Sequence, residues 1–229
     1  MAVKPTAPVK APRLVLLGPP GAGKGTLAEN LRKLPAEHLS SGELFRQQIR
    51  AESTLGQRLQ KELEGGSLVS DELTLEIMRK WFFSRPQRKG FLLDGFPRTL
   101  PQARAFDEWL EARGQMLDAA ILLQLSEEEA VERIAHRRVC PKDGKVFHLR
   151  FNPPAREGIC DLCGTPLEQR EDDREPIVRE RFRIYYRSTA PVISYYREQG
   201  LLMEISSQGH ARDLAGQVMK DLLAHLAEQ

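Results

Sequence analysis

The 229-residue sequence lacks several features that would assign it to a membrane, a secreted or a nucleic-acid-binding class. No apolar run approaches the roughly 20 residues that a membrane-spanning helix needs. The 34 basic and 32 acidic side chains leave a net charge of +2, which argues against bulk electrostatic binding to nucleic acid or to a membrane surface. Three cysteines and the lack of a secretory apolar leader predict a reducing, cytoplasmic location.

Hydrophobic residues make up 41% of the chain, which at this length is enough for one substantial core and a smaller appended unit. Residues 1–12 hold three prolines and two lysines but no apolar core, and we expect them to form a flexible tail. Strand-like and helix-like segments alternate over the rest of the chain. Such alternation is typical of an α/β fold.

Short apolar runs predict the strands of the sheet, and they lie at residues 14–17, 38–40, 91–93, 119–125 and 201–205. Five such runs separated by helices predict a parallel sheet, which binds its ligands at the carboxyl ends of the strands. Residues 18–24, Ser41 and residues 94–98 follow the first three runs directly. We therefore expect these residues to form one site.

Serine residues mark three of the predicted helix starts. Ser40 with Glu43 fits a capping box, Ser70 precedes an acidic first turn, and Ser126 precedes three glutamates. The closing helix is predicted by apolar residues at helical spacing, which are Leu214, Val218, Leu222 and Leu226.

The most informative stretch is residues 18–26, GPPGAGKGT, which lies between an apolar strand-like run and a helix-like segment. Glycines let backbone N–H groups surround an oxyanion, the helix N-terminus adds partial positive charge, and Lys24 can reach the outer phosphates. Strand, glycine-rich loop and helix in this order predict a phosphate-binding loop. The alternative is a plain glycine-rich turn.

Gly25 departs from the general pattern of such loops, because most of them have a Ser or Thr there as a magnesium ligand. Thr26 follows one residue later. Mg²⁺ would therefore be held by the nucleotide phosphates, by water and by another carboxylate.

A second motif with its own chemistry lies between residues 139 and 173. Cys140 and Asp143 form one knuckle-like pair, and Cys160 and Cys163 form another. The pairs resemble a zinc ribbon in which Asp143 replaces one cysteine, and three thiolates with one carboxylate can make a closed tetrahedral zinc site. The alternative is three reduced cysteines beside a hydrogen-bonding aspartate. The spacing of His148 fits neither pair, so we expect a structural role for it.

Six separated segments carry a specific resemblance: GPPGAGKGT, SSGELFR, GGSLVSDEL, FLLDGFPRTLPQA, ERIAHRRV, and FNPP…CDLCG…QREDD…VRERF. In this order they resemble adenylate kinases of the long-lid bacterial type, from about Arg13 onward. The resemblance implies the three-layer fold of P-loop NTPases, with a five-stranded parallel sheet flanked by helices, a small AMP-binding insert and a zinc-ribbon-like lid. The core would be residues 13–40, 70–136 and 174–229, the insert 41–69 and the lid 137–173.

The implied reaction is a reversible phosphoryl transfer in which MgATP and AMP give two ADP, in the service of adenine nucleotide homeostasis. The implied catalytic residues are Lys24, Arg98, Arg137, Arg170 and Arg181, with Asp94 binding magnesium through water. Arginine suits this role because a planar guanidinium stays charged and binds phosphate through two hydrogen bonds. Asp94 could instead cap the turn before Gly95.

The resemblance also implies the residues that bind ATP, which are Gly21, Ala22, Gly23, Lys24, Gly25, Thr26, Arg133, Arg137, Val146, Phe147 and Gln208. Arg133 corresponds to the residue stacked on the ATP adenine. Arg137 follows it by four residues, so we expect both on one face of the helix after Ser126. Phe147 stands where relatives often have tyrosine and lacks the hydroxyl.

The residues implied for AMP are Ser41, Arg46, Leu68, Val69, Gly95, Arg98, Gln102, Arg170 and Arg181. Gln102 matches the family's reader of the AMP adenine, and a neutral amide can both donate to and accept from an adenine edge. Ser41 stands where the family more often has threonine and keeps the hydroxyl.

Two rival functions share part of this pattern. A kinase for UMP or CMP would have the same phosphate loop and arginines, but the long cysteine-bearing lid and Gln102 favour AMP. A nucleic-acid-binding zinc module is disfavoured by the near-neutral charge and by the lack of an interleaved basic and aromatic surface. We therefore expect ATP, AMP and ADP as partners, Mg²⁺ and a structural Zn²⁺ as cofactors, no nucleic acid or membrane, and a monomer.

Overall fold

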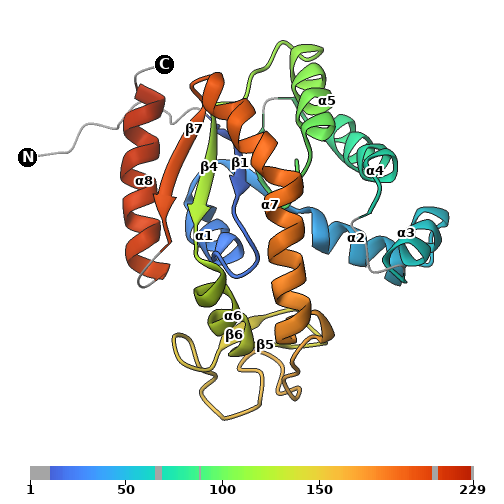
Figure 1. The fold of residues 1–229 in the computed structure, drawn as a ribbon, viewed down its shortest axis with the longest axis vertical. Helices are drawn as coiled ribbons and strands as arrows, with labels where there is room; N and C mark the ends of the chain where they lie inside the picture. The colour runs from blue at the N-terminus through green and yellow to red at the C-terminus, as the bar shows by residue number, and fades with distance from the viewer. Residues whose placement is uncertain (1–10, 65–68, 88, 208–210, 228–229) are drawn as a thin grey trace, which may run out of the picture.

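The computed structural model describes residues 11–64, 69–87, 89–207 and 211–227 (Figure 1). Most of the predicted tail, Leu68 and Gln208 lie outside these residues. Within them, the first strand begins at Arg13, one residue before the predicted apolar run. The carbonyl oxygen of the preceding Pro12, which is buried, accepts a hydrogen bond from the Phe91 N–H at 2.9 Å.

The predicted five-stranded parallel sheet is confirmed. Its strands lie in the order β2-β3-β1-β4-β7, and their bounds are β1 Arg13–Leu17, β2 Ala36–Ser40, β3 Gly90–Asp94, β4 Ala119–Gln124 and β7 Leu202–Ser206. Each adjacent pair is parallel. The carboxyl ends of β1, β2 and β3 therefore meet at one edge, as the sequence pattern requires for a single site.

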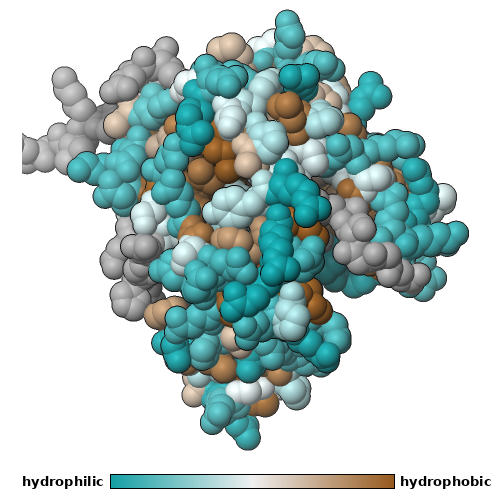
Figure 2. Space-filling model, viewed as in Figure 1, coloured by the Kyte–Doolittle hydropathy of each residue, from teal (hydrophilic) through white to brown (hydrophobic). Residues whose placement is uncertain are grey.

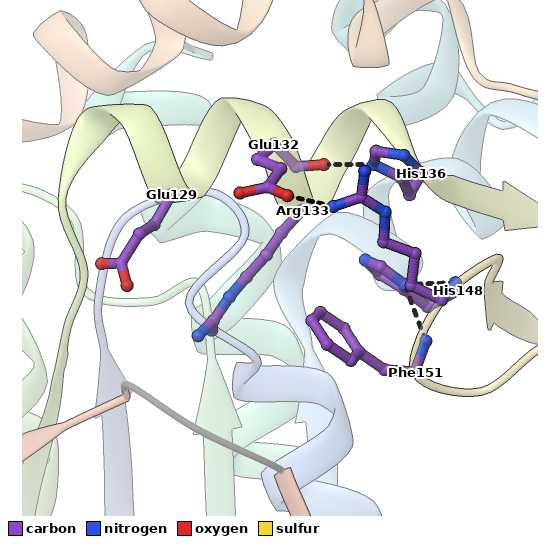
Figure 3. A pocket seen from close by; sticks show the side chains of 7 residues that line it. Glu129, Glu132, Arg133, His136, His148 and Phe151 are labelled. Carbon is purple, nitrogen blue, oxygen red and sulfur yellow. Dashed lines mark hydrogen bonds and ion pairs between the residues drawn. The ribbon is translucent and has the colours of Figure 1, made fainter.

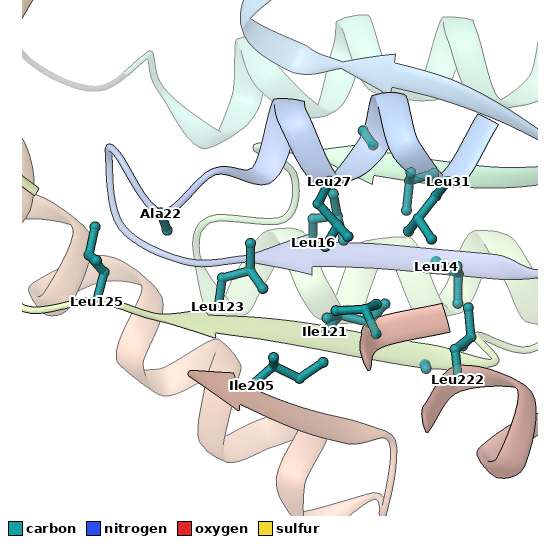
Figure 4. Close-up of a cluster of buried hydrophobic side chains, with 14 of the residues drawn as sticks. Leu14, Leu16, Ala22, Leu27, Leu31, Ile121, Leu123, Leu125, Ile205 and Leu222 are labelled. Atoms are coloured by element: carbon teal, nitrogen blue, oxygen red, sulfur yellow. The ribbon is translucent and has the colours of Figure 1, made fainter. Parts of the chain in front are cut away.

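Helices cover both faces of the sheet. The core helices are α1 Lys24–Asn30, α4 Asp71–Ser84, α5 Leu100–Glu111, α6 Glu127–Ala135, α7 Glu175–Glu198 and α8 Ala211–Ala227, and a short 3-10 turn, Leu31–Lys33, follows α1. On one face, Leu14 and Ile121 pack with α1 and with Val218 and Leu222 of α8 (Figure 4). On the other face, α4, α5 and α7 pack against alternate residues of the same strands. The result is the expected three-layer core.

Two smaller units extend from the core at the carboxyl edge of the sheet (Figure 1). The predicted insert holds α2 Ser41–Arg50 and α3 Thr54–Glu64, and Leu59 packs there against Leu73 and Ile77 of α4. The predicted lid holds the antiparallel pair β5 Arg137–Val139 and β6 Val146–His148, and also the short 3-10 helix Glu171–Asp173. Both units flank the loops that follow β1 and β3.

Two of the three predicted caps form. Ser70 accepts a hydrogen bond from the Leu73 N–H, and Ser126 forms a complete capping box with Glu129. The capping box predicted for Ser40 and Glu43 is wrong, because Ser40 makes no side-chain cap. The Glu43 carboxylate instead accepts hydrogen bonds from Arg46 at 3.0 Å and from Arg50 at 2.6 Å. Charge-assisted bonds to two guanidinium groups outcompete one bond to a backbone amide.

The surface in Figure 2 is mostly hydrophilic, with hydrophobic residues visible in small groups. Of the most exposed large hydrophobic side chains, Phe151 and Leu162 belong to the predicted lid, and Met116 lies between α5 and β4. Among the described residues, no helix is long and apolar enough to cross a membrane.

Candidate active site

The loop after β1 has the backbone of an anion cradle. Gly18, Gly21 and Gly23 have φ values of 146°, 80° and 87°. A Cβ atom at Gly18 would lie 2.8 Å from the Leu123 carbonyl oxygen, so the loop needs glycine there for space as well as for conformation. The N-terminus of α1 follows directly, and its free N–H groups add positive potential.

Lys24 is folded over this loop. Its Nζ donates hydrogen bonds to the carbonyl oxygens of Gly18, at 2.7 Å, and Pro19, at 3.0 Å. Burial lowers the pKa of Lys24 to about 8, with Asp94 opposing and with Arg98, Arg181 and Arg137 adding to the shift. The amine therefore lies among three guanidinium groups and one carboxylate.

The predicted phosphate-binding side chains gather at this point. We call Lys24, Arg46, Arg98, Arg137, Arg170 and Arg181 the cation cluster. Burial lowers the pKa of Arg170 and of Arg181, and the charges of Arg46 and Arg137 contribute to both shifts. Like charges so close to one another repel unless an anion lies between them. The arrangement suits a ligand that carries several negative charges, such as phosphates.

Four of the five arginines of the cluster, Arg46, Arg98, Arg137 and Arg181, are held by a local acceptor. Arg98 Nε donates to the Gly95 carbonyl oxygen at 2.9 Å, and Arg46 pairs with Glu43 at 2.9 Å. Arg181 Nη1 donates to the Asp172 carboxylate at 2.9 Å and to its carbonyl oxygen at 2.8 Å. The fork of Arg137 engages Asp173, with Nε at 2.8 Å from Oδ2.

Asp94 ends β3 and faces the cluster, where its charge raises the pKa of Lys24 and of Arg98. Among the described residues, its carboxylate accepts no hydrogen bond from the turn at Gly95, so the capping alternative has no support. A carboxylate beside a phosphate site is the oxygen ligand that Mg²⁺ favours, directly or through water. Gly25 offers no competing side-chain ligand, as expected.

The region predicted for AMP lies between the insert and α5. Ser41 Oγ donates to the Gly95 carbonyl oxygen at 2.8 Å. Gly95 has a φ of 82°, and a Cβ atom there would lie 2.6 Å from that same hydroxyl oxygen. Gln102 is 2% exposed and its amide is hydrogen-bonded at both ends. Val69 packs against the buried cluster of Leu59, Leu73 and Ile77.

A cavity of about 210 Å³ opens between α6 and the predicted lid (Figure 3). It is lined by Glu129, Glu132, Arg133, His136, His148, Arg150 and Phe151. Arg133 Nη2 donates to the Ser207 carbonyl oxygen at 2.7 Å. The expectation that Arg133 and Arg137 share a helix face is wrong, because α6 ends at Ala135 and Arg137 lies in β5.

Sequence reasoning missed the ring side chains of this cavity. The ring centroids of His136 and His148 lie 5.8 Å apart, and those of His148 and Phe151 lie 4.5 Å apart. His148 Nδ1 accepts backbone N–H bonds from Arg150 and Phe151, both at 3.2 Å, which places the proton of the neutral ring on Nε2. Burial lowers the pKa of His148, so the ring stays neutral at neutral pH. His148 thus lines this cavity, a place that its spacing along the chain did not predict.

The two neighbouring residues Val146 and Phe147 differ in burial. Val146 is exposed, whereas the Phe147 ring is buried beside Cys140 and Cys160. A nucleotide contact from Phe147 would therefore come from its main chain.

The four predicted metal ligands meet in the lid. Sγ of Cys140, Cys160 and Cys163 and a carboxylate oxygen of Asp143 all lie within 4.8 Å of one another. The Cys140 and Cys163 sulfurs are 3.4 Å apart, and the Cys160 thiol donates to Asp143 Oδ2 at 3.1 Å. Hydrogen bonds, first from the Cys163 thiol, hold the pKa of Asp143 well below its usual range.

The backbone repeats one pattern in both knuckles of the lid. Cys140 N–H donates to the Lys145 carbonyl oxygen, and Cys160 N–H donates to that of Thr165, both at 2.9 Å. Gly144 and Gly164 follow with φ values of 76° and 71°. Two matching knuckles with three sulfurs and one carboxylate fit a tetrahedral zinc ion.

The family profile and the curated relatives that match this chain all name the same family. A profile of the adenylate kinase family matches residues 16–201. The adenylate kinase of Moorella thermoacetica is 47% identical over 194 residues, which cover 84% of this chain and 89% of that protein. Those of Streptomyces avermitilis and Caldicellulosiruptor bescii are 45% and 42% identical, and each match covers 92% of this chain. The chain belongs to the adenylate kinase family.

Family membership confirms the fold and the chemistry expected from the sequence. The chain is a phosphotransferase of the adenylate kinase type, with ATP, AMP and ADP as substrates and products and with Mg²⁺ accompanying ATP. The phosphate loop and the arginines lie together at the edge of the sheet where parallel α/β proteins bind ligands.

Proposed function

We propose that the cation cluster transfers the γ-phosphoryl group of MgATP to AMP, reversibly, and so balances the adenine nucleotides. The observation that carries this assignment is the environment of Lys24. Its amine lies over the phosphate loop and within electrostatic reach of Arg98, Arg137 and Arg181. These cations come from four separate segments of the chain, and the phosphate loop alone does not require them to meet.

A phosphate oxygen of AMP attacks the γ-phosphorus of ATP, forming one P–O bond while the bond to the bridging oxygen of ADP breaks. No bond to the protein is needed, so the residues act by positioning and by neutralising charge. Arg46 and Arg98 suit the AMP phosphate, while Lys24, Arg137, Arg170 and Arg181 suit the transferred group. Mg²⁺ would neutralise charge on the ATP phosphates, and Asp94 would hold it through water.

The two nucleotide bases would occupy separate regions. The cavity between α6 and the lid suits the ATP adenine, because Arg133 and the His148 and Phe151 rings offer flat surfaces for stacking. Gln102 suits the AMP adenine, since its amide both donates and accepts. This residue supports AMP over UMP or CMP as the acceptor.

The lid would carry a structural zinc ion on Cys140, Asp143, Cys160 and Cys163. We further propose that the protein acts as a cytoplasmic monomer without nucleic-acid partners. The net charge of +2 supports the lack of a nucleic-acid partner.

The test compares Lys24→Ala with Lys33→Ala, a matched removal of an exposed lysine from the turn after α1. ADP formation from ATP and AMP is followed at saturating nucleotide. Loss of a preorganised cation at the reacting phosphates should lower kcat by about 10²–10³-fold or more in Lys24→Ala. Lys33→Ala should retain normal turnover. Near-normal turnover of folded Lys24→Ala would overturn the assignment.

A further inference from the structure

Asp71 is the first residue of α4, and its side chain is hydrogen-bonded to residues at the start of α5. Its Oδ1 accepts hydrogen bonds from Thr99 Oγ1 at 2.9 Å and from Gln102 Nε2 at 2.7 Å. At its other end, Gln102 Oε1 accepts the Arg98 backbone N–H at 2.8 Å. The Gln102 side-chain amide is therefore clamped from two sides in a buried position.

The two clamping groups fix which way the Gln102 amide faces. The Asp71 carboxylate can only accept hydrogen bonds, and the Arg98 backbone N–H can only donate. A flipped Gln102 amide would set its oxygen against the carboxylate and its NH₂ against the N–H. Both contacts would then be repulsive, and each would leave a buried polar group unpaired. The chemistry of the partners, rather than the shape of the side chain, selects one orientation.

The bonds to Asp71 and to the Arg98 N–H leave Gln102 one side-chain N–H and one oxygen lone pair for a ligand. Because the amide cannot turn over, the positions of this donor and this acceptor relative to each other are fixed. Adenine offers an acceptor at N1 beside a donor at N6. A 6-oxopurine such as hypoxanthine or guanine offers the reverse, with a donor at N1 beside an acceptor at O6. An amide that can rotate would serve either base, whereas an amide held in one orientation serves one of them.

We propose that Asp71 is a positioning residue that sets the base specificity of the monophosphate site. It acts through Gln102, and so the inference rests on the proposed role of Gln102 in reading the AMP base. Asp71 holds the amide in the order that matches adenine and mismatches a 6-oxopurine monophosphate.

The experiment measures kcat/KM for AMP and for IMP at saturating ATP in the full chain. In Asp71→Ala, we expect the AMP-to-IMP ratio to fall by about tenfold or more, because the amide can turn toward the other base. The KM for ATP should not change. Asp71→Asn keeps an acceptor oxygen at the same reach, and it should hold the ratio within about threefold of the wild-type value.

Glu72→Ala is the matched control. Glu72 also lies in the first turn of α4, but its side chain is 88% exposed and lies 3.8 Å from Arg58. It should leave the ratio unchanged. If Asp71→Ala does not fold, Asp71→Ser takes its place, because a serine side chain is too short to reach Gln102.

Gln102→Ala separates the two hypotheses. A collapsed ratio in Gln102→Ala with an unchanged ratio in Asp71→Ala would overturn the inference and leave the role of Gln102 intact. An unchanged ratio in Gln102→Ala would overturn the proposed role of Gln102 itself. If the AMP-to-IMP ratio falls equally in Asp71→Asn and in Asp71→Ala, the amide does not require an acceptor oxygen at residue 71, and that part of the inference is overturned.

Discussion

Arg137 and Asp173, the first and last residues of the predicted lid, form a two-point ion pair. Arg137 Nε lies 2.8 Å from Asp173 Oδ2, and Nη2 contacts Oδ1. The Asp173 side chain is fully buried, whereas that of Arg137 is 21% exposed. Because two of the five guanidinium N–H groups suffice for this pair, others remain for a phosphate. The pair thus ties the two ends of the lid together and orients a residue of the cation cluster.

Replacement of Asp173 should destabilise the protein strongly. Asp173→Asn leaves Arg137 without its buried counter-charge, and we expect a loss of about 3–5 kcal/mol in the free energy of unfolding, measured by denaturant titration. Asp172→Asn is the control, because Asp172 pairs with Arg181 at a side-chain exposure of 51%. That change should cost about 1 kcal/mol or less. Equal losses in the two variants would contradict the role of the lid-base pair.

The environment of Lys24 predicts that kcat/KM for ATP depends on pH. Burial is the main cause that lowers the pKa of Lys24 from 10.5 to about 8, and the protonated amine is the form that attracts phosphate. In the free enzyme, kcat/KM for ATP should therefore fall as pH rises above about 8, by up to about tenfold per pH unit.

Lys24→Arg provides the control for this profile. A guanidinium stays protonated throughout that range, so the variant should be less active but should show no such fall. A wild-type profile that stays level to about pH 10 would rule out Lys24 as the titrating group.

The lid should lose its order when zinc is removed. We expect about one zinc per chain in protein purified without added metal, and chelation should expose all three cysteine thiols to a thiol reagent. Burial raises the pKa of the Cys160 thiol to about 11, so binding must displace its proton and zinc affinity should fall as pH falls. Metal-free protein with unreactive thiols and full activity would instead mean that hydrogen bonds such as Cys160 to Asp143 hold the lid.

The sequence by itself determined the features that depend on local pattern. The phosphate loop follows from glycines at residues whose φ values are positive, and the parallel sheet follows from short apolar runs separated by helices. The four residues predicted to bind zinc lie close together, because each pair sits on its own short turn. Local conformation dictates these features, so nearby residues suffice to predict them.

The tertiary structure decided the contacts that join distant segments. Gln102 meets Asp71 across 31 residues, and Arg137 meets Asp173 across 36. The rings of His136 and His148 meet at a cavity because α6 ends before Arg137 and the lid strand returns beside it. The capping box predicted at Ser40 does not form, and the Glu43 carboxylate binds Arg46 and Arg50 instead. Such pairings depend on which acceptors and donors the fold brings within hydrogen-bond distance, and no spacing along the chain encodes that geometry.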